Sequence, residues 1–210
     1  MTAVTAADFA RWHADPGTFI TEVLRDPETG KPFQLTEAEF EFVARAFETD
    51  GQGRLRYPEL IYACPKKSGK TTFAAMIVLY AVLTSRVRFA EGYCIANDLE
   101  QAQGRVFAAI RRIVEACPWL GKQAKITQSK IEFPKMKASI TAIGTDYAGA
   151  AGANPTIACF DELWAYTSER SRRLWDEMVP PPTRQRACRL TTTYAGFDGE
   201  SVLLADPVGP

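Results

Sequence analysis

Histidine is almost absent from this sequence, in which His13 is the single example among 210 residues. The sequence therefore offers little histidine for a Ser/His/Asp triad or for a zinc site of cysteine and histidine. Cysteine occurs five times, but no two cysteines stand close together at metal-ligand spacing. Three of them, Cys64, Cys94 and Cys159, lie in or beside expected strands, as small buried thiols do. This distribution indicates a reducing compartment.

The formal net charge is zero, because 25 lysines and arginines balance 25 aspartates and glutamates. Any contact with nucleic acid must therefore come from a local basic patch and not from a global field. The longest apolar run, residues 73–83, is too short to span a bilayer, and the N-terminus lacks the layout of a signal peptide. We expect a globular cytosolic protein without a membrane partner.

What the sequence does have is a phosphate-binding loop that ends in Gly69-Lys70-Thr71. An apolar run suited to a buried strand precedes this loop, and a strong helix candidate, residues 73–83, follows it. Backbone N–H groups and the helix dipole at such a junction hold a polyphosphate. The usual pattern has a further glycine five residues before the Gly-Lys pair, where this chain has Cys64. A second signal is therefore needed.

The second signal lies about ninety residues downstream, where an apolar strand ends in the adjacent acids Asp161 and Glu162. A carboxylate at the end of a buried strand beside the phosphate loop is placed to hold Mg²⁺, which prefers oxygen ligands. The next residue then faces the attacking water. An Asp-Glu pair is a weak motif alone, but together the two signals predict binding of a nucleoside triphosphate with Mg²⁺.

Strands and helices alternate around these motifs, which predicts an α/β fold: a three-layer α/β/α P-loop NTPase with a mainly parallel central sheet and the ligand at the carboxyl ends of the strands. Strands are predicted at residues 60–63, 92–96, 139–143, 156–160 and 189–193, and helices at residues 35–47, 70–84, 99–117 and 168–178. The polar stretch 124–133 is predicted to form a hairpin strand. Residues 1–30 are interpreted as an N-terminal extension and residues 31–200 as the P-loop domain.

With both motifs in place, the sequence resembles the N-terminal ATPase part of the large terminase subunit, the RecA-like ASCE motor that packages DNA into tailed-phage heads. The loop Pro65-Lys66-Lys67-Ser68-Gly69-Lys70-Thr71 is similar to the divergent terminase loop, in which the first glycine is not expected. Residues 30–35 resemble the adenine-side segment of the family, and residues 149–155 leading into 161–165 resemble its Walker B run. Residues 190–198 resemble its Thr-Thr-x-Ala-Gly coupling motif. The resemblance covers residues 30–200.

The resemblance implies a role for each matching residue. Lys70 bridges the β and γ phosphates of ATP, Thr71 and Asp161 hold Mg²⁺, and Glu162 orients or deprotonates the attacking water. Lys66 senses the γ phosphate or is a plain solvated lysine. The implied nucleotide-binding set is Cys64, Pro65, Lys66, Lys67, Ser68, Gly69, Lys70, Thr71, Thr72 and Gln34. The implied coupling set is Thr191, Thr192, Thr193 and Gly196, a run that is also typical of an ordinary strand.

The chain departs from the family pattern in three places. Ala38-Glu39 stands where many relatives have Trp-Gln, so Gln34 is either the adenine reader or a surface residue. No arginine lies between Arg112 and Asp161, so a trans-acting arginine finger must come from elsewhere. Three arginines of the last predicted helix are candidates, against a solvated helix face as the alternative: Arg170, Arg172 and Arg173. The RNase-H-like nuclease half of the family has no room after Gly196, so residues 201–210 are interpreted as the start of a linker and no nuclease activity is expected.

The resemblance also implies partners: double-stranded DNA, the portal protein, the small terminase subunit and further copies of the chain in a ring on the portal, all in the host cytoplasm. The isolated domain is expected to be monomeric. Five lysines form the basic segment that either contacts DNA phosphates or protects an edge strand: Lys122, Lys125, Lys130, Lys135 and Lys137. The alternative functions are a helicase-like translocase, a small-molecule P-loop kinase and a non-catalytic ATP-binding module that docks on the portal or the small subunit.

Overall fold

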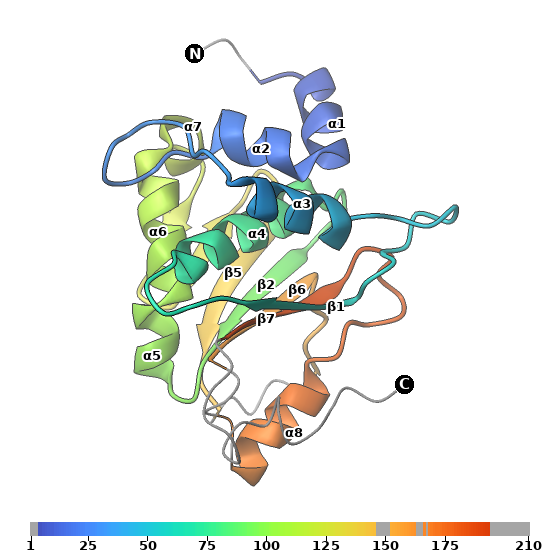
Figure 1. Ribbon diagram of the computed structural model, residues 1–210, viewed down its shortest axis with the longest axis vertical. Helices are drawn as coiled ribbons and strands as arrows, with labels where there is room; N and C mark the ends of the chain where they lie inside the picture. Colours follow the sequence, from blue (N-terminus) through green and yellow to red (C-terminus); the bar gives the residue numbers. More distant parts are fainter. Residues whose placement is uncertain (1–3, 146–151, 163–165, 167, 194–210) are drawn as a thin grey trace.

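The computed structural model describes residues 4–145, 152–162, 166 and 168–193. Its centre is one seven-stranded sheet with the strand order β1-β7-β6-β2-β5-β4-β3 (Figure 1). The strands are β1 (Glu59–Ala63), β2 (Ala90–Ile95), β3 (Lys125–Ile126), β4 (Lys130–Phe133), β5 (Ala138–Ile143), β6 (Ile157–Asp161) and β7 (Cys188–Thr193).

Five of these strands run parallel, and only the hairpin of β3 and β4 at one edge is antiparallel. The predicted α/β fold with a mainly parallel sheet is confirmed, as is the hairpin within residues 124–133. Strand β7 lies between β1 and β6, so the threonine run separates the phosphate-loop strand from the strand that ends in Asp161. Because these three strands are parallel neighbours, their carboxyl ends lie side by side.

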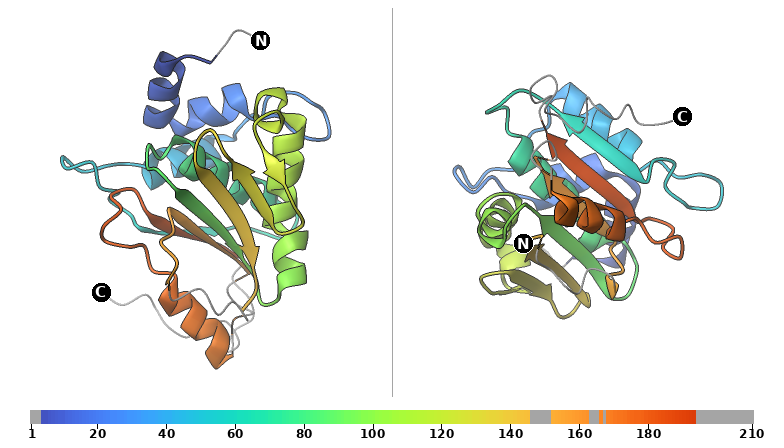
Figure 2. Two further views of the ribbon diagram at one scale, coloured as in Figure 1. Left: turned by 180° about the vertical axis from the view of Figure 1, so that it is seen from behind. Right: turned by 90° about the horizontal axis from the view of Figure 1, so that it is seen from below.

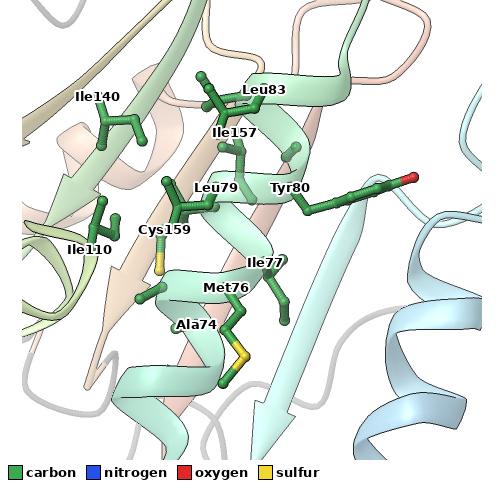
Figure 3. Close-up of a cluster of buried hydrophobic side chains, with 14 of the residues drawn as sticks. Ala74, Met76, Ile77, Leu79, Tyr80, Leu83, Ile110, Ile140, Ile157 and Cys159 are labelled. Carbon is green, nitrogen blue, oxygen red and sulfur yellow. The ribbon is translucent and has the colours of Figure 1, made fainter. Parts of the chain in front are cut away.

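Helices cover both faces of the sheet (Figure 2). Helix α4 (Lys70–Thr84) and helix α6 (Val106–Ala116) lie on one face, where Leu79 belongs to the same apolar cluster as Ile157 and Cys159 of β6 (Figure 3). The other face carries Phe160 and its neighbours, which pack with α8 (Glu169–Glu177). Because side chains alternate along a strand, successive residues of β6 supply two separate cores.

Helix α4 is buried almost all round, and the N-terminal helices explain why. Helices α1 (Ala6–Ala14), α2 (Pro16–Val23) and α3 (Glu37–Ala46) lie over the side of α4 that faces away from the sheet. The ring of Tyr80 lies 5.7 Å from that of Phe19 and 4.5 Å from that of Phe47. A helix covered on every side needs apolar residues on every side, as α4 has.

The helix predicted over residues 99–117 is wrong in one respect, because it is two helices. Arg105 separates helix α5 (Leu99–Gly104) from α6, and its φ of −114° and ψ of −105° are not helical. Gly104 weakens the helix at this point, but the apolar periodicity continues through it. The short helix α7 (Pro118–Gly121) then leads to the β3–β4 hairpin. Within the described residues, no helix is both long and apolar enough to cross a membrane.

Candidate nucleotide-binding site

The phosphate loop connects the carboxyl end of β1 to the first residue of α4. Gly69 precedes that helix with a left-handed φ of 86°, a conformation that glycine adopts without steric cost. No side chain caps the helix there. The N–H groups of its first turn are therefore left without a side-chain acceptor, and together with the helix dipole they form a site for an anion.

Cys64, which stands in place of the first loop glycine, takes part in closing the loop. The Ser68 hydroxyl lies 2.9 Å from the Cys64 sulfur and donates a hydrogen bond of 2.7 Å to the carbonyl of Pro65. The backbone N–H of Cys64 donates to the carbonyl of Thr193 at 3.2 Å. The loop is thus tied to itself and to the end of β7 without a glycine at position 64.

Lys70 and Glu162, which are 92 residues apart in sequence, form an ion pair at the carboxyl edge of the sheet. The Lys70 ammonium nitrogen lies 2.5 Å from the Glu162 carboxylate, and their side chains are 10% and 15% exposed. Glu162 has a positive φ of 58°, and its N–H donates to the carbonyl of Thr192 at 2.8 Å. A non-glycine residue in this conformation is strained, and such strain concentrates at functional sites.

Asp161 lies beside this pair with its side chain only 4% exposed. The Thr192 hydroxyl donates to one carboxylate oxygen at 3.0 Å, and the Arg105 guanidinium lies 3.5 Å from the other. Burial raises the pKa of Asp161, while the Thr192 hydrogen bond and the Arg105 charge oppose that rise. Arg105 was not predicted as a site residue. A glycine followed by an arginine inside an amphipathic helix pattern is the local signal that indicates such a break.

Comparison with known families identifies the group to which these residues belong. Residues 47–202, well over half of the chain, match the family described as "Terminase large subunit, ATPase domain". The chain belongs to this family. A search of curated proteins found no match.

Two solved terminase structures resemble the chain. The crystal structure of the HK97 bacteriophage large terminase has a TM-score of 0.70 at 19% identity, over 86% of this chain and 37% of that one. The Thermus phage P74-26 large terminase ATPase domain has a TM-score of 0.45 at 16% identity, over 80% of this chain and 73% of that one. The first likeness supports the fold. The chain spans little more than a third of the HK97 protein.

A terminase ATPase domain binds ATP, and the donors present fit a magnesium ion bound with it. The Asp161 carboxylate ends β6, and the Thr71 hydroxyl belongs to the first turn of α4. Both are the hard oxygen ligands that Mg²⁺ prefers. The described part of the chain holds no group of three or more acidic, histidine or cysteine side chains that could bind a metal. The remaining ligands would be phosphate oxygens and water.

The other predicted site residues lie at varying distances from this centre. In the loop Lys66 and Lys67 are exposed, and Lys67 has a φ of 64°; Thr72 is half-buried in α4. Thr191, Thr192 and Thr193 are all buried in β7. Gly196 lies outside the described residues. Gln34 is exposed just before α3.

The proposed finger residues and the lysine segment lie on the surface of this terminase domain. Arg170, Arg172 and Arg173 are exposed on α8, and Arg173 pairs with Glu169 at 2.7 Å. Lys125, Lys130 and Lys137 line a hollow of about 440 Å³ at the hairpin edge, where Lys130 pairs with Glu132 at 2.7 Å. Lys122 and Lys135 are exposed nearby in sequence. These positions are compatible with both interpretations of the lysines.

Proposed function

We propose that this domain hydrolyses ATP with Mg²⁺ to drive double-stranded DNA into a viral procapsid. The observation that carries the proposal is the meeting of Lys70, Asp161 and Glu162 at one edge of the sheet, beside an uncapped helix N-terminus. This set contains a cation for the phosphates, a carboxylate for a metal and a second carboxylate for water. A site that only binds ATP would not need the second carboxylate.

Each residue acts at a different stage. Lys70 and the N–H groups of the first turn of α4 bind the β and γ phosphates, while Asp161 and Thr71 hold the metal. Bound Mg²⁺ supplies positive charge that offsets the charge on the transferring phosphoryl group. Lys70 cannot bind phosphate and keep its present contact with Glu162 at full strength. ATP binding therefore loosens the Lys70–Glu162 pair, and Glu162 becomes able to accept a proton from water.

The partners of this motor are proposed from the same family membership. The portal protein, the small terminase subunit and other copies of the chain would form a ring in the host cytoplasm, and a neighbour would supply the arginine finger. The five lysines between Lys122 and Lys137 would contact DNA phosphates without reading sequence, as point charges do.

The test of this function is steady-state ATP hydrolysis by the purified chain, with and without double-stranded DNA. The Glu162→Gln variant is expected to lose hydrolysis by about a hundredfold or more, because it removes the general base. Glu177→Gln, on the exposed side of α8, is the matched control and should hydrolyse ATP at the parent rate. Turnover that survives Glu162→Gln would show that the base is another residue. Binding of ATP without any turnover would favour the docking module.

A further inference from the structure

The guanidinium of Arg105 takes the place at Asp161 where a metal cation is expected. It lies 3.5 Å from a carboxylate oxygen, and the two side chains are 44% and 4% exposed. Asp161 accepts its other hydrogen bond from the neutral hydroxyl of Thr192. The nearby hydroxyl of Tyr166 is buried but makes no hydrogen bond with the described residues. Among the described side chains, Arg105 is thus the cation that forms an ion pair with this buried acid.

The backbone at Arg105 fits a role at this site. The break between α5 and α6 falls on Arg105 itself, although the apolar pattern of the sequence runs through it. Its φ of −114° and ψ of −105° are sparsely populated for any residue other than glycine. An outlier of this kind is maintained by its surroundings and is a reason to suspect function. Here the outlier belongs to the one residue of this helix pair that forms an ion pair with Asp161.

Each acid of the proposed nucleotide site forms an ion pair with a cation. Glu162 faces Lys70 and Asp161 faces Arg105, so two carboxylates are met by two cations. A buried carboxylate without a partner is strongly unfavourable, so the site needs this compensation before nucleotide arrives. When ATP binds, Lys70 is proposed to move to the phosphates. Arg105 can return to solvent instead, because its side chain is nearly half exposed.

We propose that Arg105 is a positioning residue that stands in for Mg²⁺ at Asp161 and is displaced when the metal-nucleotide complex binds. This inference rests on the proposed nucleotide site. Between rounds of ATP hydrolysis, Arg105 neutralises the charge of Asp161 and holds the orientation of its carboxylate. Metal-free nucleotide is therefore not repelled by an unpaired carboxylate. The same contact competes with the metal for the carboxylate oxygen. Removing Arg105 therefore affects nucleotide binding differently with and without Mg²⁺.

The experiment measures the dissociation constant of a fluorescent ATP analogue twice, in excess EDTA and in saturating Mg²⁺. In the Arg105→Ala variant, binding in EDTA should weaken, because Asp161 repels the phosphates. Binding in Mg²⁺ should stay equal or tighten. The dissociation constant in EDTA divided by that in Mg²⁺ is thus expected to rise by about tenfold, the size of a charge-assisted contact. A variant with a merely damaged fold would weaken both constants alike and leave the ratio unchanged.

Two further variants make the result decisive. Arg105→Lys keeps the charge and should keep a ratio near that of the parent. Arg111→Ala removes an exposed arginine of α6, the helix that follows Arg105, and should change neither constant. An unchanged ratio in Arg105→Ala, or an Arg105→Lys variant that behaves like alanine, overturns the stand-in role. If the parent itself binds no nucleotide under either condition, the proposed function fails instead, which is a separate outcome.

Discussion

Asp161 and Glu162 are neighbours in sequence but have different surroundings, and this difference supports the different roles proposed for them. Asp161 is the last residue of β6 and is buried against Thr192 and Arg105. Glu162 leaves the strand in a left-handed conformation that directs it to Lys70. The burial and the two contacts of Asp161 fix its position, which suits the proposed metal ligand. Glu162 forms an ion pair with Lys70, which the proposed ATP binding would loosen.

The first prediction separates ATP binding from hydrolysis at Lys70 and Glu162. Lys70→Ala should abolish detectable nucleotide binding, because Lys70 contacts the phosphates in the ground state. Glu162→Gln should bind ATP at least as tightly as the parent, since the neutral amide holds Lys70 less strongly than the carboxylate does. Equilibrium binding of labelled ATP measures both effects. Weaker binding by Glu162→Gln would contradict the competition between Glu162 and phosphate for Lys70.

The second prediction concerns the hydrogen bond from Thr192 to Asp161. Thr192→Val keeps the shape of the side chain but leaves a buried carboxylate oxygen without its donor, so we expect a loss of about 1–3 kcal/mol in the free energy of unfolding. Thr192→Ser keeps the hydroxyl and should lose much less. Urea denaturation followed by circular dichroism measures the difference. Equal stability of the serine and valine variants would mean that the donor contributes nothing.

At the scale of elements, His13 joins the first helix to the end of α4. One ring nitrogen lies 2.6 Å from the carbonyl of Thr84 and the other 2.8 Å from the Arg186 guanidinium. The ring therefore donates to the carbonyl and accepts from the guanidinium, which only a neutral imidazole can do. Burial lowers the pKa of His13, the Thr84 carbonyl opposes this, and the charges of Arg186 and Arg86 add to the lowering.

The third prediction is a loss of stability in mild acid that depends on His13. Because its pKa in the folded chain lies below the ordinary value of 6.5, the unfolded chain binds the proton first as pH falls. The contribution of His13 is complete above pH 6.5 and is lost as pH falls from there through the lower pKa of the folded state. His13→Gln should remove this part of the pH dependence. Urea denaturation of both proteins across that range makes the comparison, and parallel curves would contradict it.

At the scale of the whole molecule, the sheet separates the ATP site from the lysine segment. Strand β1, which leads into the phosphate loop, forms one edge of the sheet, and the β3–β4 hairpin forms the other. Helices α5, α6 and α7 follow one another between Asp98 and the hairpin, with Arg105 at their first break. A chain of packed elements thus lies between the nucleotide site and the proposed DNA contact.

The fourth prediction tests the lysines at that edge. Replacing Lys122, Lys125 and Lys135 with glutamine should lower the slope of log affinity against log salt by up to about three units for double-stranded DNA, and leave basal ATP hydrolysis intact. Lys130→Gln should matter less, because Lys130 is already paired with Glu132. Lys31→Gln, an exposed lysine before α3, is the control. A salt slope that does not change in the triple variant would leave the lysines as protection of an edge strand.

The fifth prediction concerns assembly. The isolated chain should elute as a monomer and turn over slowly, because an arginine finger from a neighbour, worth about a thousandfold in rate, is missing in solution. Sizing-column fractions assayed for ATP hydrolysis at several protein concentrations measure both properties. Fast turnover by a monomer, independent of concentration, would contradict a finger acting in trans.

The sequence by itself determined the features that local patterns encode. The Gly69-Lys70-Thr71 loop, the acids at the end of β6, the parallel sheet and the lysine hairpin could all be predicted, because the motifs and the alternation of strands with helices are patterns of residues close together in the chain. The domain boundaries at residues 30 and 200 stay predictions. The roles of the individual site residues stay predictions as well.

Only the tertiary structure decided which distant residues meet. Arg105 reaches Asp161 across 56 positions, and His13 reaches Arg186 across 173. The sequence predicted one helix where the structure has two, because helical periodicity reports which face is buried and carries no information about an ion pair with another strand. Such contacts depend on how elements pack, which no local pattern contains. The stand-in role of Arg105 could therefore be inferred only after the sheet had brought α5, α6 and β6 together.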